Sequence, residues 1–388
     1  MGCGNTEVIC HYSLTTHFTS TISIEDFING IPKAELHLHI EGTFEPELMF
    51  KIAQRNNKKI KYQSIEELKE SYNFNNLQDF YDITWAYLEK IHSQKVIHAE
   101  IFFDPQTHTD RGIKFSTVIK GIHRALEDGQ NKLGISSMLI MCFLRHLDEE
   151  AAMRTLEESL DYKNWITAVG LDSSEGGHPP SKFQRVFDQA RKEGFLTVAH
   201  AGEEGPSEYV WEALNLLKVS RVDHGNHSLD DEKLVQKLVD LKMPLTVCPL
   251  SNLKLKVIQD LKKHPLKKMM NKGLLVTINS DDPAYFGGYV NENYLAITEA
   301  LNLSKEDIYQ LAKNSFVASF LDDETKLQMI KRVDKYYRLY PDVKKAGEKT
   351  KESAVKENFD DLMKEIEKRT IIRKYQIKEK PLLHSQLS

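Results

Sequence analysis

The sequence is poor in the features that mark several large classes of protein. Its four cysteines include no C-x-x-C pair, which argues against a disulfide framework and a thiolate zinc site and favours a reducing compartment. The longest uncharged apolar stretch, Met138 to Leu144, is far shorter than the roughly 18 residues of a membrane-spanning helix, so we expect no transmembrane segment. The 52 Lys and Arg against 57 Asp and Glu give a formal charge of -5, which predicts no nucleic-acid partner.

The N-terminal region also lacks basic residues, because the first Lys or Arg is Lys33. It has neither the charged and apolar regions of a secretory signal nor an Arg-rich transit peptide. We therefore expect the protein in the cytoplasm, and a nuclear location is also compatible with the sequence. Met1 to Thr6 match the M-G-x-x-x-[ST] pattern of myristoylation, and acyl chains on Gly2 and Cys3 would attach the protein to a membrane. Since one acyl chain binds only marginally and no basic patch assists, we favour an unmodified, flexible tail over residues 1–25.

The central part of the chain alternates between two kinds of pattern. Eight β-rich apolar runs are separated by one-sided helical patterns, such as Phe183, Val186, Phe187 and Ala190 at i, i+3, i+4 and i+7. Strands that alternate with helices pair in parallel, and eight such units predict an α/β fold, a closed (β/α)8 TIM barrel with additional helices. The runs lie at residues 33–39, 97–103, 135–145, 166–173, 196–200, 221–225, 245–250 and 274–280.

No linker or low-complexity tract separates a second core from this repeat. We therefore expect one barrel domain over residues 26–341. Residues 342–388 are rich in Lys and Glu, which predicts a charged, partly helical extension. Nothing in the sequence indicates an oligomeric state.

Residues with metal-binding side chains gather at the ends of the predicted strands. His37 and His39 are two positions apart in the first run, so both imidazoles are expected on the same side of the strand. An isolated H-x-H pair is weak evidence, but other polar residues end the fifth, sixth and eighth runs, at the rim where barrel enzymes carry their active sites. They are His200 and Glu203, Asp223 and His224, and Asp281 and Asp282.

This collection of side chains favours a catalytic metal site. Adjacent aspartates after an apolar strand are costly to bury unless a cation neutralises them. Neutral imidazoles with one carboxylate suit Zn²⁺, and the absence of nearby cysteine favours a catalytic rather than a closed structural site. Water bound to such an ion has its pKa lowered from about 15.7 towards about 7, which makes hydrolytic attack on an electrophilic carbon the natural chemistry.

Five motifs occur in the order found in one family of enzymes. Together they resemble the adenosine and adenine deaminases of the metal-dependent hydrolase barrels, over roughly residues 30–325. The motifs are PKAELHLHIEGT (32–43), HAGEE (200–204), DHGNHS (223–228), CPLSNLKL (248–255) and NSDDPAYFGGY (279–289).

The resemblance implies a role for each matching residue. One Zn²⁺ per chain would be bound by His37, His39, His200 and Asp281. Glu203 would protonate purine N1 while hydroxide attacks C6, His224 would orient and activate that hydroxide, and Asp282 would hydrogen-bond N7. The products would be a 6-oxopurine and ammonia.

The choice of purine depends on two further carboxylates. Adenosine-specific members typically follow H-x-H with L-D-G, whereas this chain has I-E-G, which places Glu41 where an aspartate faces the ribose. The longer side chain would intrude on the sugar and contact the N9 or N3 edge of a free base. The segment GLDSSEGGHP (170–179) places Glu175 near the base, or behind the metal ligands. The resemblance therefore favours deamination of adenine to hypoxanthine, a step of purine salvage.

Four alternatives differ from this interpretation. Deamination of adenosine or of an N6-modified AMP would keep the same zinc residues, and a barrel that only binds a purine or a protein partner would normally show a broken ligand set. The H-x-E and P-C-x-x-C zinc deaminases are excluded, because the cysteine pair is missing. Two-metal relatives bridge their ions with a modified lysine after the fourth strand, where this chain has Ser173, Ser174 and Glu175.

Overall fold

The computed structural model describes residues 22–45, 55, 76–341 and 343–344. The chain divides into two units, one formed by its two ends and the other by Glu25–Tyr337. In the first, the short strands β1 (Ile22–Ser23) and β10 (Val343–Lys344) pair in parallel. The barrel and the candidate site belong to the second.

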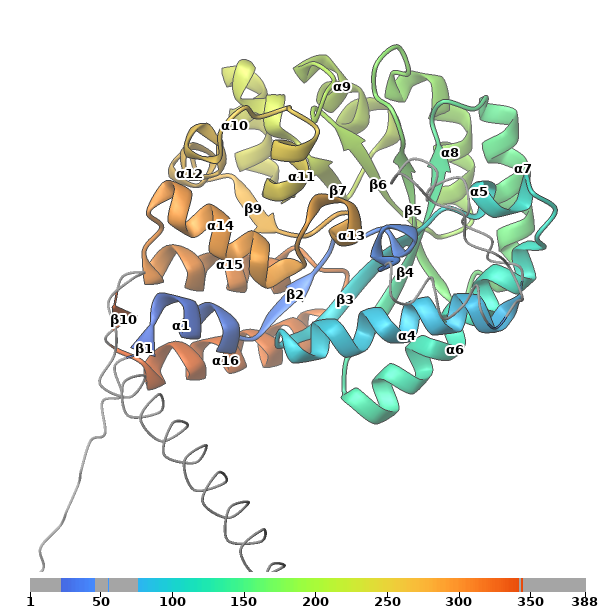
Figure 1. The fold of residues 1–388 in the computed structure, drawn as a ribbon. Coiled ribbons are helices and arrows are strands. Elements are labelled where there is room, and N and C mark those ends of the chain that lie inside the picture. Colours follow the sequence, from blue (N-terminus) through green and yellow to red (C-terminus); the bar gives the residue numbers. More distant parts are fainter. Residues whose placement is uncertain (1–21, 46–54, 56–75, 342, 345–388) are drawn as a thin grey trace, which may run out of the picture. The chain divides into compact units, whose positions relative to one another are not determined.

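The described part of Glu25–Tyr337 contains an eight-stranded parallel sheet whose strands follow one another in chain order (Figure 1). The predicted TIM barrel is thereby confirmed, and each predicted apolar run overlaps one strand. The strands are β2 (Lys33–Glu35), β3 (Val96–Phe103), β4 (Ser136–Leu144), β5 (Ile166–Asp172), β6 (Leu196–Ala201), β7 (Arg221–His224), β8 (Pro244–Val247) and β9 (Leu275–Ile278).

The segments that follow the first strand, β2, and the last strand, β9, contact each other beyond the regular hydrogen bonds of the sheet. Strand β2 ends at Glu35, earlier than predicted, because the Leu36 N–H donates to the Asn279 side chain, 2.9 Å away, instead of to backbone. The chain continues in the same direction and forms a bridge between Leu38 and Asp281. The His39 N–H donates to the Asp281 carbonyl at 3.0 Å, which joins the first strand region to the last.

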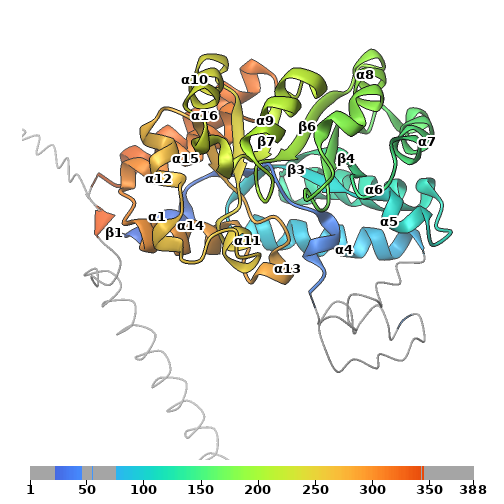
Figure 2. The same ribbon diagram turned by 90° about the horizontal axis from the view of Figure 1, so that it is seen from above.

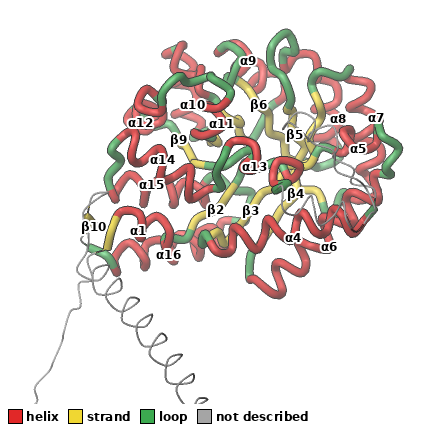
Figure 3. Tube along the Cα trace, viewed as in Figure 1, coloured by secondary structure: helices red, strands yellow, loops and turns green. Residues whose placement is uncertain are grey.

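Helices surround the strands, as the same ribbon shows when turned by 90° (Figure 2) and when coloured by secondary structure (Figure 3). The predicted one-sided patterns are confirmed, since α8 buries Val186, Phe187 and Ala190. The helices are α1 (Ile24–Gly30), α4 (Leu77–Ser93), α5 (Pro105–Thr109), α6 (Phe115–Leu133), α7 (Glu149–Ser159), α8 (Gln184–Lys192), α9 (Ser207–Glu212), α10 (Glu232–Leu241), α11 (Pro249–Lys254), α12 (Leu266–Asn271), α13 (Pro283–Phe286), α14 (Val290–Leu301), α15 (Lys305–Val317) and α16 (Asp323–Leu339).

A buried ion pair crosses the barrel interior below the strand ends. Arg221 of β7 binds Glu100 of β3 and also donates to the Leu36 carbonyl, 3.0 Å away. Burial would raise the pKa of Glu100, but Arg221 and His98 hold that pKa below its ordinary value. Separation of the two strands would leave each charge buried without its partner, which is costly. The ion pair therefore holds β3 and β7 together, although they are far apart in the sequence.

Some predictions from the sequence fall outside the described residues. These are most of the predicted tail, with Gly2 and Cys3, and nearly all of the C-terminal extension. In the part of the chain that the structure describes, no helix is both long and apolar enough to cross a membrane.

Candidate active site

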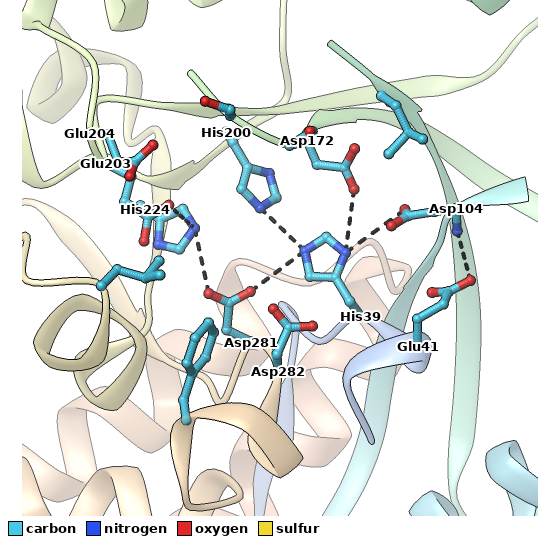
Figure 4. A pocket seen from close by; sticks show the side chains of 15 residues that line it. His39, Glu41, Asp104, Asp172, His200, Glu203, Glu204, His224, Asp281 and Asp282 are labelled. Atoms are coloured by element: carbon cyan, nitrogen blue, oxygen red, sulfur yellow. Dashed lines mark hydrogen bonds and ion pairs between the residues drawn. The ribbon is translucent and has the colours of Figure 1, made fainter. Parts of the chain in front are cut away.

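Residues that follow the strands converge on a cavity of about 390 Å³ (Figure 4). Seven of the residues predicted from the sequence line this cavity: His39, Glu41, His200, Glu203, His224, Asp281 and Asp282. His37 is fully buried beside them, whereas Glu175 does not line the cavity.

Four predicted metal ligands bring one donor atom each to the same place. The His37 Nε2 and Asp281 Oδ1 atoms are 3.3 Å apart, as are the Nε2 atoms of His39 and His200. The distance from His39 Nε2 to Asp281 Oδ1 is 3.6 Å. Donors about 2.1 Å from a tetrahedral ion lie about 3.4 Å from one another, and these three separations are of that size. Among the described residues, however, the group whose donor atoms all lie within 4.8 Å of one another is His37, His200, His224 and Asp281, whereas His39 groups with Asp104 and Asp172. His224 is therefore a further candidate ligand.

The first of these donors is His37 Nε2, and hydrogen bonds to the other nitrogen of its ring orient its lone pair. The Thr246 hydroxyl donates to Asp223 at 2.8 Å and therefore accepts the hydrogen bond from His37 Nδ1, at 2.9 Å. This leaves His37 Nε2 unprotonated, and that buried atom has no hydrogen-bond partner. An unpartnered imidazole nitrogen facing a carboxylate is the arrangement that a metal ion satisfies.

Two of the imidazoles, those of His200 and His224, are neutral at physiological pH. Burial and the neighbouring histidines lower the pKa of His200 well below its ordinary value and that of His224 to about 3. Burial would raise the pKa of Asp281, but His37 and the other histidines lower it, so Asp281 is a carboxylate. Neutral imidazoles and an ionised carboxylate are the forms that bind a metal, so His200, His224 and Asp281 fit a divalent ion, whereas His39, whose pKa is raised, would lose a proton on binding it.

Two of these residues have strained backbones. His224 and Asp281 have positive φ angles of 62° and 64°, a left-handed conformation that non-glycine residues rarely adopt. Such strain persists only where the surroundings impose it, and it concentrates at functional sites.

Glu203 lies beside His224 in the cavity. Its Oε2 atom is 3.3 Å from His224 Nε2, and its Oε1 atom accepts a hydrogen bond of 3.0 Å from the Asn252 amide. Burial, with the neighbouring Asp281 and Glu175 carboxylates, raises the pKa of Glu203 well above its ordinary value. These surroundings therefore favour the carboxylic acid form of the side chain, which can donate a proton.

Asp282 lies on the opposite side of Asp281 and is also protonated at neutral pH. Burial and the Asp281 carboxylate raise its pKa to about 8. It packs directly on Gly42 of the I-E-G motif, where any Cβ atom would collide with the Asp282 side chain. This contact explains the glycine that follows Glu41.

Glu175 organises the loop that carries Glu203 instead of contacting the cavity. One carboxylate oxygen accepts from the Gly202 N–H at 3.0 Å, and the other accepts from the N–H groups of Glu203, Glu204 and Gly205 at 2.6 to 2.9 Å. With both oxygens used and only 2% of the residue exposed, direct contact with a substrate is not supported. The sequence could place this residue after a strand, but not tell which way it faces.

We expect Glu175→Gln to lower kcat about 10- to 100-fold while KM and metal content change little. The amide group of glutamine would present N–H donors to backbone N–H groups, so the loop would shift and misplace the Glu203 carboxyl. Steady-state kinetics with metal analysis would test this, with the exposed Glu208→Gln as control. A large rise in KM with unchanged kcat would instead indicate substrate contact.

Two hydrogen bonds to one carboxylate oxygen hold the Glu41 side chain in place. Its Oε1 atom accepts hydrogen bonds from His108 Nε2 at 2.9 Å and from the Asp104 N–H at 3.2 Å, while its buried Oε2 atom has no hydrogen-bond partner. Glu41 therefore lines the cavity with one free carboxylate oxygen, as the prediction of a substrate contact requires.

Asp104 and Asp172 are site residues that the sequence analysis missed. They follow β3 and end β5, and their carboxylates lie 3.9 Å and 3.4 Å from His39 Nδ1. Burial lowers the pKa of His39, but Asp104, Asp282 and Asp172 outweigh burial and raise it. The signal was available, because both aspartates occupy strand ends like the residues that were identified.

Known proteins are similar to this chain in sequence and in fold. The family model described as "Adenosine deaminase" matches residues 32–80 and 73–336. An adenine deaminase from Acinetobacter baylyi is 59% identical over 326 residues, which cover 80% of this chain and 98% of the relative. One from Hahella chejuensis is 56% identical over 330 residues, covering 81% and 99%.

Solved structures of related proteins are also similar to this chain. The crystal structure of an adenine deaminase from Arthrobacter aurescens has a TM-score of 0.76 at 44% identity, covering 79% of this chain and 99% of that one. An amidohydrolase from Burkholderia ambifaria with bound Zn has a TM-score of 0.77 at 25% identity, covering 83% and 97%. With the family model matching most of the barrel, the chain belongs to the adenosine deaminase family.

Proposed function

We propose that the protein is a Zn²⁺-dependent adenine deaminase that converts free adenine and water to hypoxanthine and ammonia, a step of purine salvage. The observation that carries this proposal is the cluster of His37, His200, His224 and Asp281, with His39 beside it and Glu203, whose pKa is raised, 3.3 Å from His224. The adenine deaminases that are more than half identical to this chain support the choice of adenine.

His37, His39, His200 and Asp281 would hold one Zn²⁺ ion. When bound, this Lewis acid lowers the pKa of water, so that a strong nucleophile is available near neutral pH. Asp223 and Thr246 fix the orientation of His37 from behind, and the carboxylate of Asp172 does the same for His39.

The protein's own side chains handle the protons. Glu203, oriented by Asn252, donates its proton to purine N1, which makes C6 more electrophilic. Neutral His224 accepts a hydrogen bond from the attacking water, and protonated Asp282 donates to N7. Addition of water to C6 and loss of the amino group as ammonia leave the 6-oxo group of hypoxanthine.

The charge of the cavity disfavours a nucleotide. Of the described residues that line it, none is Lys or Arg, whereas several are acidic. A phosphate group in such a wall would find no cation and would be repelled by carboxylates. This argues against the alternative of an N6-modified AMP as substrate.

Parallel assays of the purified protein with adenine, adenosine, AMP and N6-methyladenine test the proposal. We expect ammonia release from adenine with a kcat/KM at least about ten times that of the others, by the discrimination that a site built for one substrate achieves. A tenfold preference for adenosine would overturn the choice of adenine. Purine binding without any ammonia release would favour the non-enzymatic alternative.

A further inference from the structure

We propose that His264 is a positioning residue for the reaction, because it fixes the orientation of the Asn252 amide and thereby places the acidic proton of Glu203 on the oxygen beside His224. His264 lies in the segment between α11 and α12, and it is not among the described residues that line the cavity. This inference rests on the proposed function and adds to it a residue that acts through Asn252. We call His264, Asn252 and Glu203 the positioning chain.

One ring nitrogen of His264 is used by the helix that follows it. His264 Nδ1 accepts a hydrogen bond of 3.1 Å from the Leu266 N–H, the first N–H of α12. That N–H has no acceptor within its own helix, so the His264 side chain supplies one. The imidazole is buried, and burial lowers the pKa of His264 to about 4, so the ring is neutral at physiological pH. A neutral imidazole that accepts at Nδ1 carries its hydrogen on Nε2.

The hydrogen on Nε2 determines the orientation of the Asn252 amide. His264 Nε2 lies 3.3 Å from Asn252 Oδ1, so the imidazole donates to this oxygen. The other end of the amide, Nδ2, then donates to Glu203 Oε1 at 3.0 Å. A reversed amide would place its NH2 group against the Nε2–H of His264, and two donors that face each other in a buried place are costly. His264 therefore favours one orientation of Asn252.

The orientation of Asn252 decides which oxygen of Glu203 carries the proton that the proposed reaction needs. An NH2 group donates best to a carboxyl oxygen without hydrogen, so the hydrogen of the carboxylic acid belongs on Oε2. Oε2 is the oxygen 3.3 Å from His224 Nε2, within the candidate active site. If the amide were reversed, its oxygen would accept the hydrogen of Glu203 and hold it away from purine N1. His264 thus keeps the acid available to the substrate.

Two substitutions of His264 separate this role from a purely structural one. The amide nitrogen of glutamine can take the place of Nε2, so His264→Gln keeps a donor to Asn252 and loses the acceptor for the Leu266 N–H. The amide oxygen of asparagine can take the place of Nδ1, so His264→Asn keeps that acceptor and loses the donor. His92→Asn, at an exposed position in the last turn of α4, is the matched control.

The experiment measures kcat and KM for adenine, with metal content, for each variant. We expect His264→Asn to lower kcat about 10- to 100-fold while KM and metal content change little, because only the acid is misplaced. His264→Gln should retain most of the wild-type kcat, and His92→Asn should match wild type. Asn252→Ala should lower kcat by itself, and adding His264→Asn to it should cause no further loss, since His264 acts through Asn252.

Three kinetic results would overturn the inference. They are wild-type kcat in His264→Asn, an equal loss of kcat in His264→Gln and His264→Asn, and losses from Asn252→Ala and His264→Asn that multiply in the double variant. Nitrogen NMR of the wild-type imidazoles, with the His264 signals assigned by their absence from His264→Gln, gives a test without kinetics, and hydrogen on Nδ1 would also overturn the inference. If wild type released no ammonia from adenine, the proposed function would fail separately, and the NMR measurement would still test the orientation of the positioning chain.

Discussion

Glu203→Gln is expected to lower kcat for adenine by about three orders of magnitude or more while metal content stays at the wild-type level. Proton transfer by a positioned acid contributes about 10²- to 10⁴-fold to a rate, and glutamine has no proton to give to N1. The substitution keeps the size of the side chain and an oxygen that can still accept from Asn252. Single-turnover kinetics and metal analysis of the same preparation would measure both quantities.

The comparison with Glu208→Gln makes this prediction specific, since Glu208 is exposed on α9. That control should retain wild-type kcat. Near-normal turnover by a metal-loaded Glu203→Gln protein would show that N1 receives its proton from another group.

Removal of the metal is expected to have the second large effect. Chelation should abolish deamination, and addition of Zn²⁺ should restore it, because the nucleophile is not available near neutral pH without the ion. The melting temperature should fall by several degrees, since Asp281 and the surrounding carboxylates lose the positive charge that offsets their burial. Activity assays and thermal unfolding with and without chelator would measure these changes.

Asp281→Ala provides an independent version of the same experiment. It should fail to regain activity when Zn²⁺ is added, because one of the four donors is missing. A chelated protein that remains fully active, or an Asp281→Ala protein with full metal content, would contradict the metal assignment.

The barrel could be predicted from the sequence because its strands are short apolar runs in a regular alternation with helices. The same regularity located His37, His200 and Asp281, since the carboxyl ends of parallel strands share one rim. Their donor atoms indeed meet, which no local property of the sequence could have shown. The end of β2 at Glu35 depends on a hydrogen bond to the side chain of Asn279, which is far away in the sequence. It could therefore not be predicted from the local sequence.

The roles of the other acidic residues depend on which way each side chain points, and the sequence does not contain that information. Asp172 ends β5 and Glu175 follows it three positions later, yet Glu175 binds backbone N–H groups of a loop and Asp172 lines the cavity. Glu175 was predicted because a motif includes it, whereas Asp104 was missed because no motif does. Side-chain direction after a strand end is set by the turn, and here by the tertiary contacts of that turn.

The joining of the first and last strand regions has a consequence for how the enzyme matures. His37 and His39 leave the ribosome more than two hundred residues before Asp281, with which they share the centre and the bridge at Leu38. A nascent chain therefore carries two of the four donors through most of translation without being able to assemble the full set. Under the proposed metal assignment, complete binding of the ion follows synthesis of the last strand, and products truncated before Asp281 should not retain the metal.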